Sequence, residues 1–183
     1  MKHPTTWILI AAVTAGGLGL AAERWLYPAT PTSATRTAIA PAKVGDTMPP
    51  LTLPTLDGHP IHLPGDHAGR PLLLNFWASW CAPCLEEMPE LAHFSREQAG
   101  GGVQVIGIAL DTPEAARAFL SHTPVDYPIL LDSPSANDTS VQLGNVHGVL
   151  PYSVLVGADG KVIKTKTGPF KHDEIRAWAL GSR

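Results

Sequence analysis

The sequence predicts an α/β fold in which parallel strands are joined by crossover helices around a central sheet. Two apolar runs, 72–78 and 103–110, are short for helices and are typical of strands buried on both faces. Each run is followed by a segment of helical character, at 82–98 and at 115–121. This alternation of strands and helices favours crossover connections between parallel strands.

The chain begins with an apolar segment, and we expect residues 1–27 to be a membrane anchor or an export signal. Residues 7–22 carry no charge and are close to the lower limit of about 17 residues for a transmembrane helix. Lys2 precedes this run, which favours an inner-membrane anchor with the domain outside the cytoplasm. The alternative is a signal cleaved near Gly19-Leu20-Ala21, which would release a soluble periplasmic protein.

Residues 28–42 are rich in Pro, Thr and Ala and have almost no large apolar side chains, which predicts a linker. The alternative is a disordered tail that follows a cleaved signal. Residues 43–183 are then expected to form one domain. With 44% hydrophobic residues, the chain can form a core without disulfides as staples.

Charge and histidine placement exclude two classes of partner. The formal net charge is -3, so the sequence offers no basic surface for nucleic acid. The eight histidines are scattered, and no pair has a convincing metal-ligand spacing. We therefore predict no metal site and no cofactor.

Smaller elements surround the two buried runs. Alternating apolar residues on either side of Asp57-Gly58 predict a short β-hairpin at 51–63. Five further elements are expected after residue 121, in this order: an extended segment at 127–132, a short helix at 135–143, a strand at 152–156, a strand at 161–164 and a helix at 172–180.

The only two cysteines, Cys81 and Cys84, lie where the first buried strand turns into a helix. This order places Cys81 at a helix N-terminus, where unpaired backbone N–H groups and the helix dipole stabilise a thiolate. Cys84 lies three residues further on, within disulfide distance of Cys81 but further inward. The arrangement favours thiol–disulfide exchange, with Cys81 as the nucleophile and Cys84 as the resolving cysteine.

Two other roles for the cysteine pair compete with exchange. A purely structural disulfide would close a very short loop and would remove little conformational entropy from the unfolded chain. A zinc site needs a second pair of Cys or His ligands, and none has the required spacing. Both roles are less favoured than redox chemistry.

The segment Phe-Trp-Ala-Ser-Trp-Cys-Ala-Pro-Cys at 76–84 resembles the active-site segment of thioredoxins. It more closely resembles the TlpA/ResA group of membrane-anchored, extracytoplasmic thioredoxin-like proteins. Residues 148–160 resemble the cis-proline loop, strand and hairpin turn of that group. The resemblance covers residues 43–181 and implies a thioredoxin fold with an N-terminal β-hairpin extension and a central βα insertion.

The resemblance also implies where a substrate binds. Trp80, Ala82 and Pro83 are expected to contact it beside Cys81. Further along the chain, the Leu150–Pro151 bond is expected to be cis.

That cis bond would place Pro151 opposite Cys81, so that the backbone of Leu150 can pair with an extended substrate segment. The alternative is a trans proline at a strand edge. The group usually has a small or hydroxyl residue after this proline, whereas this chain has Tyr152, which is expected to narrow the substrate groove.

Glu87 is the expected acid–base partner of the thiols. It falls on the same helix face as Cys84, Met88 and Leu91, where desolvation would raise its pKa and allow proton exchange with the thiols. In ResA-like proteins, the acidic residue three positions after the second cysteine is thought to tune the thiols, and Glu87 has this spacing. The alternative is that Glu87 tilts toward solvent.

Asn75 occupies the strand position where thioredoxin has a buried aspartate that assists proton transfer. An amide cannot transfer protons in this way, so the difference moves the acid–base role toward Glu87. The simpler interpretation, that Asn75 is a hydrogen-bonded core residue, is compatible with this one.

These observations predict a membrane-tethered, extracytoplasmic thiol–disulfide oxidoreductase. By resemblance, it is a reductant that takes electrons from a membrane dithiol donor. Its targets would be periplasmic protein disulfides, such as those of apocytochrome c or of copper-site assembly proteins.

The alternative functions are a disulfide oxidant or isomerase, a thiol peroxidase-like redoxin and a non-catalytic binding module. The peroxidase loop Pro-x-x-x-Thr-x-x-Cys does not occur in the sequence.

Overall fold

The structure is a computed structural model that describes residues 40–181. The anchor or signal segment expected at 1–27 and most of the linker expected at 28–42 lie outside the described residues. Within the described part of the chain, no helix has the length and apolar character that crossing a membrane requires.

A five-stranded mixed sheet forms the centre of the domain, with strand order β5-β4-β3-β6-β7. Its strands are β3 (Leu72–Trp77), β4 (Gln104–Leu110), β5 (Ile129–Asp132), β6 (Tyr152–Val156) and β7 (Val162–Thr167). The first three strands pair in parallel, as the alternation of strands and helices predicts, whereas β6 and β7 join antiparallel. Every residue of β3 is buried, which explains why its sequence is apolar except for Asn75.

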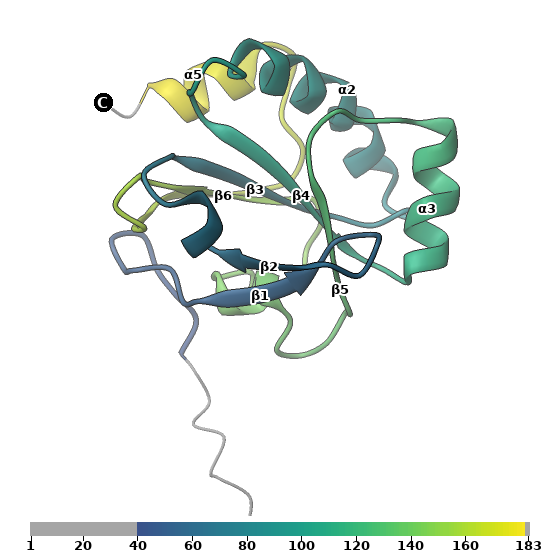
Figure 1. Ribbon diagram of the computed structural model, residues 1–183, viewed down its shortest axis with the longest axis horizontal. Coiled ribbons are helices and arrows are strands. Elements are labelled where there is room, and N and C mark those ends of the chain that lie inside the picture. Colours follow the sequence, from purple (N-terminus) through teal and green to yellow (C-terminus); the bar gives the residue numbers. More distant parts are fainter. Residues whose placement is uncertain (1–39, 182–183) are drawn as a thin grey trace, which may run out of the picture. The chain divides into compact units, whose positions relative to one another are not determined.

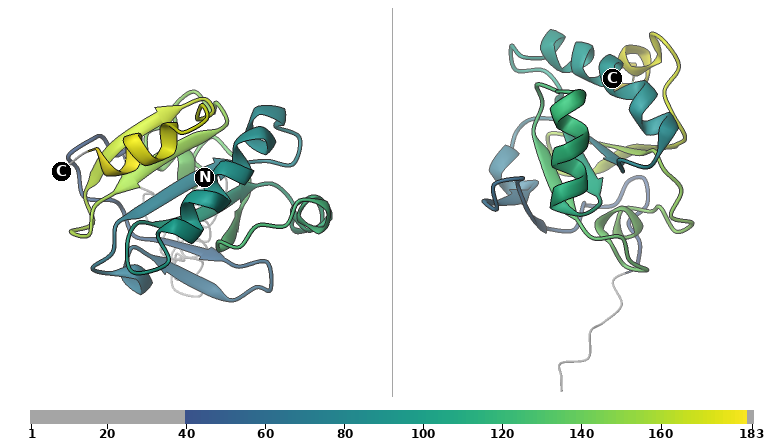
Figure 2. Two further views of the ribbon diagram at one scale, coloured as in Figure 1. Left: turned by 90° about the horizontal axis from the view of Figure 1, so that it is seen from above. Right: turned by 90° about the vertical axis from the view of Figure 1, so that its right-hand side faces the viewer.

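Three helices cover one face of this sheet: α2 (Ala82–Glu97), α3 (Pro113–His122) and α5 (Glu174–Leu180). Figure 1 shows α2 and α5 side by side over the strands. Seen from above, α2 lies between α5 and α3 (Figure 2). Buried side chains of these helices pack on Leu73 and Trp77, so the helices are fixed against the central part of the sheet.

The opposite face of the sheet is covered by a β-hairpin and by α4 (Thr139–Gln142) with the residue that follows it. The hairpin consists of β1 (Leu51–Pro54) and β2 (Pro60–Leu63), which pair antiparallel as the sequence predicts. A 3₁₀ turn, η1 (Gly65–His67), follows β2. Apolar residues of the hairpin pack on Leu72, Leu74 and Phe76 of β3, whose alternating side chains thus divide the core into two layers.

Capping side chains set the bounds of the smaller helices. Thr112 accepts a hydrogen bond from the N–H of Ala115 at the start of α3, and Pro113 follows it at the first helical position. The helix expected at 135–143 is shorter, because Asp138 caps α4 through the N–H groups of Ser140 and Val141. The strand expected at 161–164 extends to Thr167, since it pairs along the whole length of β6.

Candidate active site

A disulfide joins Cys81 and Cys84 at the start of α2, with their Cα atoms 5.3 Å apart. Cys81 is the N-cap residue, and its carbonyl accepts hydrogen bonds from the N–H groups of Cys84 and Leu85 at 3.0 and 3.2 Å. Cys84 is fully buried and Cys81 is 5% exposed. Cys84 is thus the more deeply buried of the two, as expected from its position further inward, and Cys81 is also buried in the disulfide form.

Asp111 stabilises the turn that connects β3 to α2 and contains Cys81. One oxygen of its carboxylate accepts hydrogen bonds from the backbone N–H and the hydroxyl of Ser79, at 2.9 and 2.6 Å. The other oxygen accepts from the N–H of Thr112 at 2.9 Å. Asp111 was not among the residues predicted from the sequence to belong to the site. The signal was its position at the carboxyl end of the parallel strand next to β3, where functional groups of α/β sheets gather.

Replacement of Asp111 by alanine is expected to destabilise the oxidised protein by about 1–2 kcal/mol, because three donors lose their acceptor at a partly buried turn. Denaturant unfolding measures this loss. Asp126→Ala is the matched control, since it removes only the exposed ion pair with Arg96 and should cost less than about 1 kcal/mol. Equal losses for the two variants would contradict the role of Asp111.

The residues around Cys81 form an exposed rim. Trp80 is 69% exposed, Ala82 is exposed and Pro83 is partly exposed in the first turn of α2. An exposed tryptophan beside a disulfide offers a large apolar contact surface to a partner.

The Leu150–Pro151 bond is cis, which excludes the trans alternative. Pro151 directly precedes β6, and Tyr152 of β6 lies opposite Phe76 near the end of β3. The cis-proline loop therefore lies at the end of the sheet from which the chain enters the cysteine turn. Leu150 also packs against the core cluster that contains both cysteines. A second cis bond, Leu63–Pro64, was not predicted from the sequence.

The expectation that Tyr152 narrows the substrate groove is wrong. Its side chain is 3% exposed and packs into the core on the hairpin side, with its ring centroid 6.2 Å from that of Phe76. Its hydroxyl donates a hydrogen bond to the carbonyl of Leu143 at 3.0 Å. Since Tyr152 lies opposite Phe76 in the sheet, it shares the face of Phe76 and points away from the α2 side, where Cys84 lies.

Glu87 lies on the buried face of α2, so the alternative in which it tilts toward solvent is wrong. The residue is 2% exposed, and each carboxylate oxygen faces an N–H donor. Oε1 accepts from Nδ2 of Asn75 at 2.7 Å, and Oε2 accepts from the backbone N–H of Phe170 at 2.8 Å. Burial raises the pKa of Glu87 to about 7, although the two hydrogen bonds and the charge of Lys166 oppose this shift.

Asn75 is fully buried on β3 and links Glu87 to the neighbouring strand. The same Nδ2 group that binds Glu87 also donates to Oγ of Ser153 on β6, at 3.1 Å. Asn75 is thus a hydrogen-bonded core residue that also holds the carboxyl group. Ser153 and Phe170 were not anticipated, because both are far from Glu87 in the sequence.

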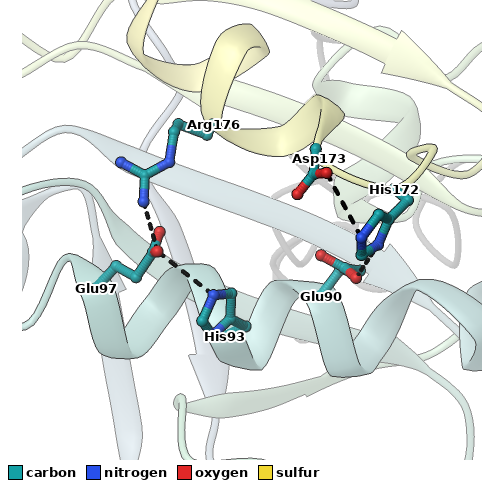
Figure 3. A network of polar contacts seen from close by, with 6 residues as sticks. All are labelled: Glu90, His93, Glu97, His172, Asp173 and Arg176. Carbon is teal, nitrogen blue, oxygen red and sulfur yellow. Dashed lines mark hydrogen bonds and ion pairs between the residues drawn. The ribbon is translucent and has the colours of Figure 1, made fainter.

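Ion pairs connect the outer surface of α2 to α5 (Figure 3). His172 lies 2.6 Å from Glu90 through Nδ1 and 3.5 Å from Asp173 through Nε2. Glu97 pairs with Arg176 at 2.5 Å, and His93 lies 3.4 Å from Glu97. These contacts on the outer surface of α2 therefore hold α5, and with it the Phe170 segment, against α2.

Glu90, His172 and Asp173 bring three potential metal ligands within 4.8 Å of one another, which the sequence did not indicate. Both ring nitrogens of His172 face carboxylates, and His172 and Asp173 are highly exposed. We therefore assign these residues to the ion-pair network.

Comparisons with known proteins agree with this geometry. Residues 43–178 match the family model described as Redoxin. The chain belongs to the redoxin family. Thiol-disulfide oxidoreductase ResA of Geobacillus thermodenitrificans is 31% identical over 144 residues, which cover 77% of each chain. Sporulation thiol-disulfide oxidoreductase A of Bacillus subtilis is 27% identical over 128 residues, covering 68% of this redoxin and 74% of the relative.

Solved structures give the same result. A putative thiol:disulfide interchange protein DsbE from Chlorobium tepidum has a TM-score of 0.65 and 27% identity, and the match covers 77% of this chain and 98% of that one. StoA from Bacillus subtilis has a TM-score of 0.57 and 26% identity, with 72% and 96% covered. The protein is thus a redoxin with a thioredoxin-like fold and a thiol–disulfide oxidoreductase of the ResA/StoA type.

Proposed function

We propose that this redoxin reduces disulfides of periplasmic proteins, with Cys81 as the nucleophile, Cys84 as the resolving cysteine and Glu87 as their proton partner. The observation that carries the proposal is the disulfide at the N-terminus of α2, in which Cys84 is fully buried, together with the buried side chain of Glu87 three residues further along the same helix. A cysteine at a helix N-terminus has a lowered pKa, which favours the attacking thiolate.

The reaction starts from the dithiol form. The Cys81 thiolate attacks one sulfur of the target disulfide, and the other target sulfur leaves as a thiolate. Cys84 then loses its proton and attacks the Cys81 sulfur of the mixed disulfide, which releases the second target thiolate and forms the Cys81–Cys84 disulfide. Two electrons pass to the target. The proton of Cys84 passes to the Glu87 carboxylate, whose pKa of about 7 suits both its uptake and its release.

Substrate binding is assigned to both sides of the cysteine turn. Trp80, Ala82 and Pro83 supply the rim on the α2 side, and the cis Leu150–Pro151 bond supplies the other side. An extended target segment would pair with the backbone of Leu150, as in other cases of strand addition.

The cellular setting follows from the resemblance to the TlpA/ResA group. Residues 1–27 would anchor the protein in the inner membrane, or direct its export before cleavage, and place the redoxin domain in the periplasm. A membrane dithiol donor would regenerate the dithiol. Candidate targets are apocytochrome c and copper-site assembly proteins.

The reduction potential of the Cys81–Cys84 couple tests the direction of transfer. We expect a value nearer to the roughly −270 mV of thioredoxin than to the roughly −120 mV of the strong oxidant DsbA. Equilibration with glutathione or dithiothreitol buffers, followed by quantification of the two redox forms, gives this potential. A potential close to that of DsbA would overturn the reductant role and support the oxidant alternative.

A further inference from the structure

Both carboxylate oxygens of Glu87 are occupied by donors in the structure. Oε1 accepts from the side-chain amide of Asn75, and Oε2 accepts from the backbone N–H of Phe170. This pattern suits the ionised carboxylate, which is an acceptor only. A protonated Glu87 carries an O–H on one oxygen, and that O–H would then face an N–H group.

Only one of the two donors can change its role. The N–H of Phe170 belongs to the backbone and always donates. The amide of Asn75 can turn by 180° about its terminal torsion, which exchanges its oxygen and nitrogen within nearly the same volume. After this turn, the Asn75 oxygen would accept the O–H of Glu87, while Oε2 would still accept from Phe170.

Ser153 can hydrogen-bond to the Asn75 amide in both orientations. Ser153, the other partner of the amide, has a hydroxyl that can accept from Nδ2 or donate to Oδ1. Oδ1 of Asn75 is buried and has no hydrogen-bond partner among the described residues. The turn moves Nδ2 into this position, where its two N–H groups have no acceptor among the described residues, so the reversal depends on the two hydrogen bonds that the turned oxygen accepts from the O–H groups of Glu87 and Ser153.

We propose that Asn75 is the positioning residue of Glu87 and that its amide reverses when Glu87 gains or loses a proton. Glu87 thereby keeps two buried hydrogen bonds in both protonation states. This proposal rests on the proposed role of Glu87 as proton partner of the thiols, and it explains how a buried acid can change protonation there without losing a partner.

Other charged groups shift the pKa of Glu87 but do not supply a hydrogen bond that can reverse its direction. Lys166 of β7 favours the ionised form, and Glu174 of α5 disfavours it, both through space. Tyr127, just before β5, is buried and also senses the charge of Glu87, which contributes to its raised pKa. None of these three side chains has a hydrogen bond to Glu87 in the described residues, so the reversible contact belongs to Asn75.

The test is NMR spectroscopy of the oxidised full chain, in which the cysteines do not titrate. The Glu87 carboxyl carbon gives the titration midpoint, and nuclear Overhauser contacts of the Asn75 amide protons give its orientation. We expect the contacts with Ser153 to be lost as the pH falls, with the same midpoint as Glu87. The amide of Asn145 is an internal control, because both of its ends are bonded within the 140–149 segment.

A substitution provides a second readout. Asn75→Leu has a similar size but no polar atoms, so the ionised carboxylate loses a donor, and the midpoint of Glu87 should rise by about one pH unit. Tyr152→Phe removes a buried hydroxyl on the other face of the sheet and should leave the midpoint in place. An Asn75 amide that keeps its contacts through the titration, or an unchanged midpoint in Asn75→Leu, would overturn the proposal. Neither result would bear on disulfide exchange itself, which trapping through the cysteines tests separately.

Discussion

Replacement of Cys84 by serine is expected to stop the reaction halfway and to accumulate a mixed disulfide between Cys81 and the target protein. Serine cannot resolve the adduct, because its hydroxyl is not ionised near neutral pH and an oxygen cannot form a disulfide. Catalytic turnover with a protein disulfide should fall by about three orders of magnitude or more, as expected when a reacting group is removed. Non-reducing electrophoresis and mass spectrometry of the adduct measure the trap.

Cys81→Ser is the matched control for this experiment. It leaves Cys84 as the remaining thiol, fully buried beneath the first turn of α2. This variant should show the same loss of turnover but no adduct. An adduct that forms through Cys84 would reverse the assigned roles, and the absence of an adduct in Cys84→Ser would contradict the mechanism.

The oxidised protein is expected to lose stability as the pH rises through the range in which Glu87 ionises. The pKa of Glu87 is about 7 in the folded protein and 4.5 in its unperturbed state. Between these values the folded form binds more protons than the unfolded form, so the free energy of unfolding falls with increasing pH. One pKa unit corresponds to about 1.4 kcal/mol, and the whole loss therefore amounts to about 3 kcal/mol.

Glu87→Gln removes this dependence. A glutamine can present its oxygen to the N–H of Phe170 and its amide nitrogen to the reversed oxygen of Asn75, which imitates the protonated acid. Its stability should match that of the natural protein below about pH 4.5 and exceed it by about 3 kcal/mol above pH 7.

Denaturant unfolding at both pH values gives the comparison. Glu86→Gln replaces the exposed glutamate that directly precedes Glu87, and its stability should depend on pH in the same way as that of the natural protein. Parallel pH profiles for the natural protein and Glu87→Gln would show that Glu87 is ionised in the same range whether folded or unfolded.

Local sequence patterns were sufficient to place the cysteines and Glu87. The apolar run of β3, the change to a helical period and the spacing of Glu87 from Cys84 all lie within one short segment. Residues that are close in sequence have positions fixed by strand and helix geometry. The burial of Glu87 followed from the same periodicity.

The partners of these residues were not predictable in this way. Phe170 reaches Glu87 only because α5 packs beside α2, and Asp111 reaches Ser79 only because β4 lies next to β3. Tyr152 was misplaced for a similar reason. Its direction depends on its register opposite Phe76, which the sequence of one strand does not contain.

Because the N–H of Phe170 donates a hydrogen bond to Glu87, the environment of this carboxyl group depends on where the domain ends at its carboxyl terminus. A recombinant fragment that stops before residue 170 would retain both cysteines and every strand of the central sheet. Its Glu87 would, however, lose the hydrogen bond from the backbone N–H of Phe170, and the fragment would lack α5. Redox and proton-transfer measurements on such a shortened fragment would therefore report on a Glu87 in a different environment from that of the intact protein.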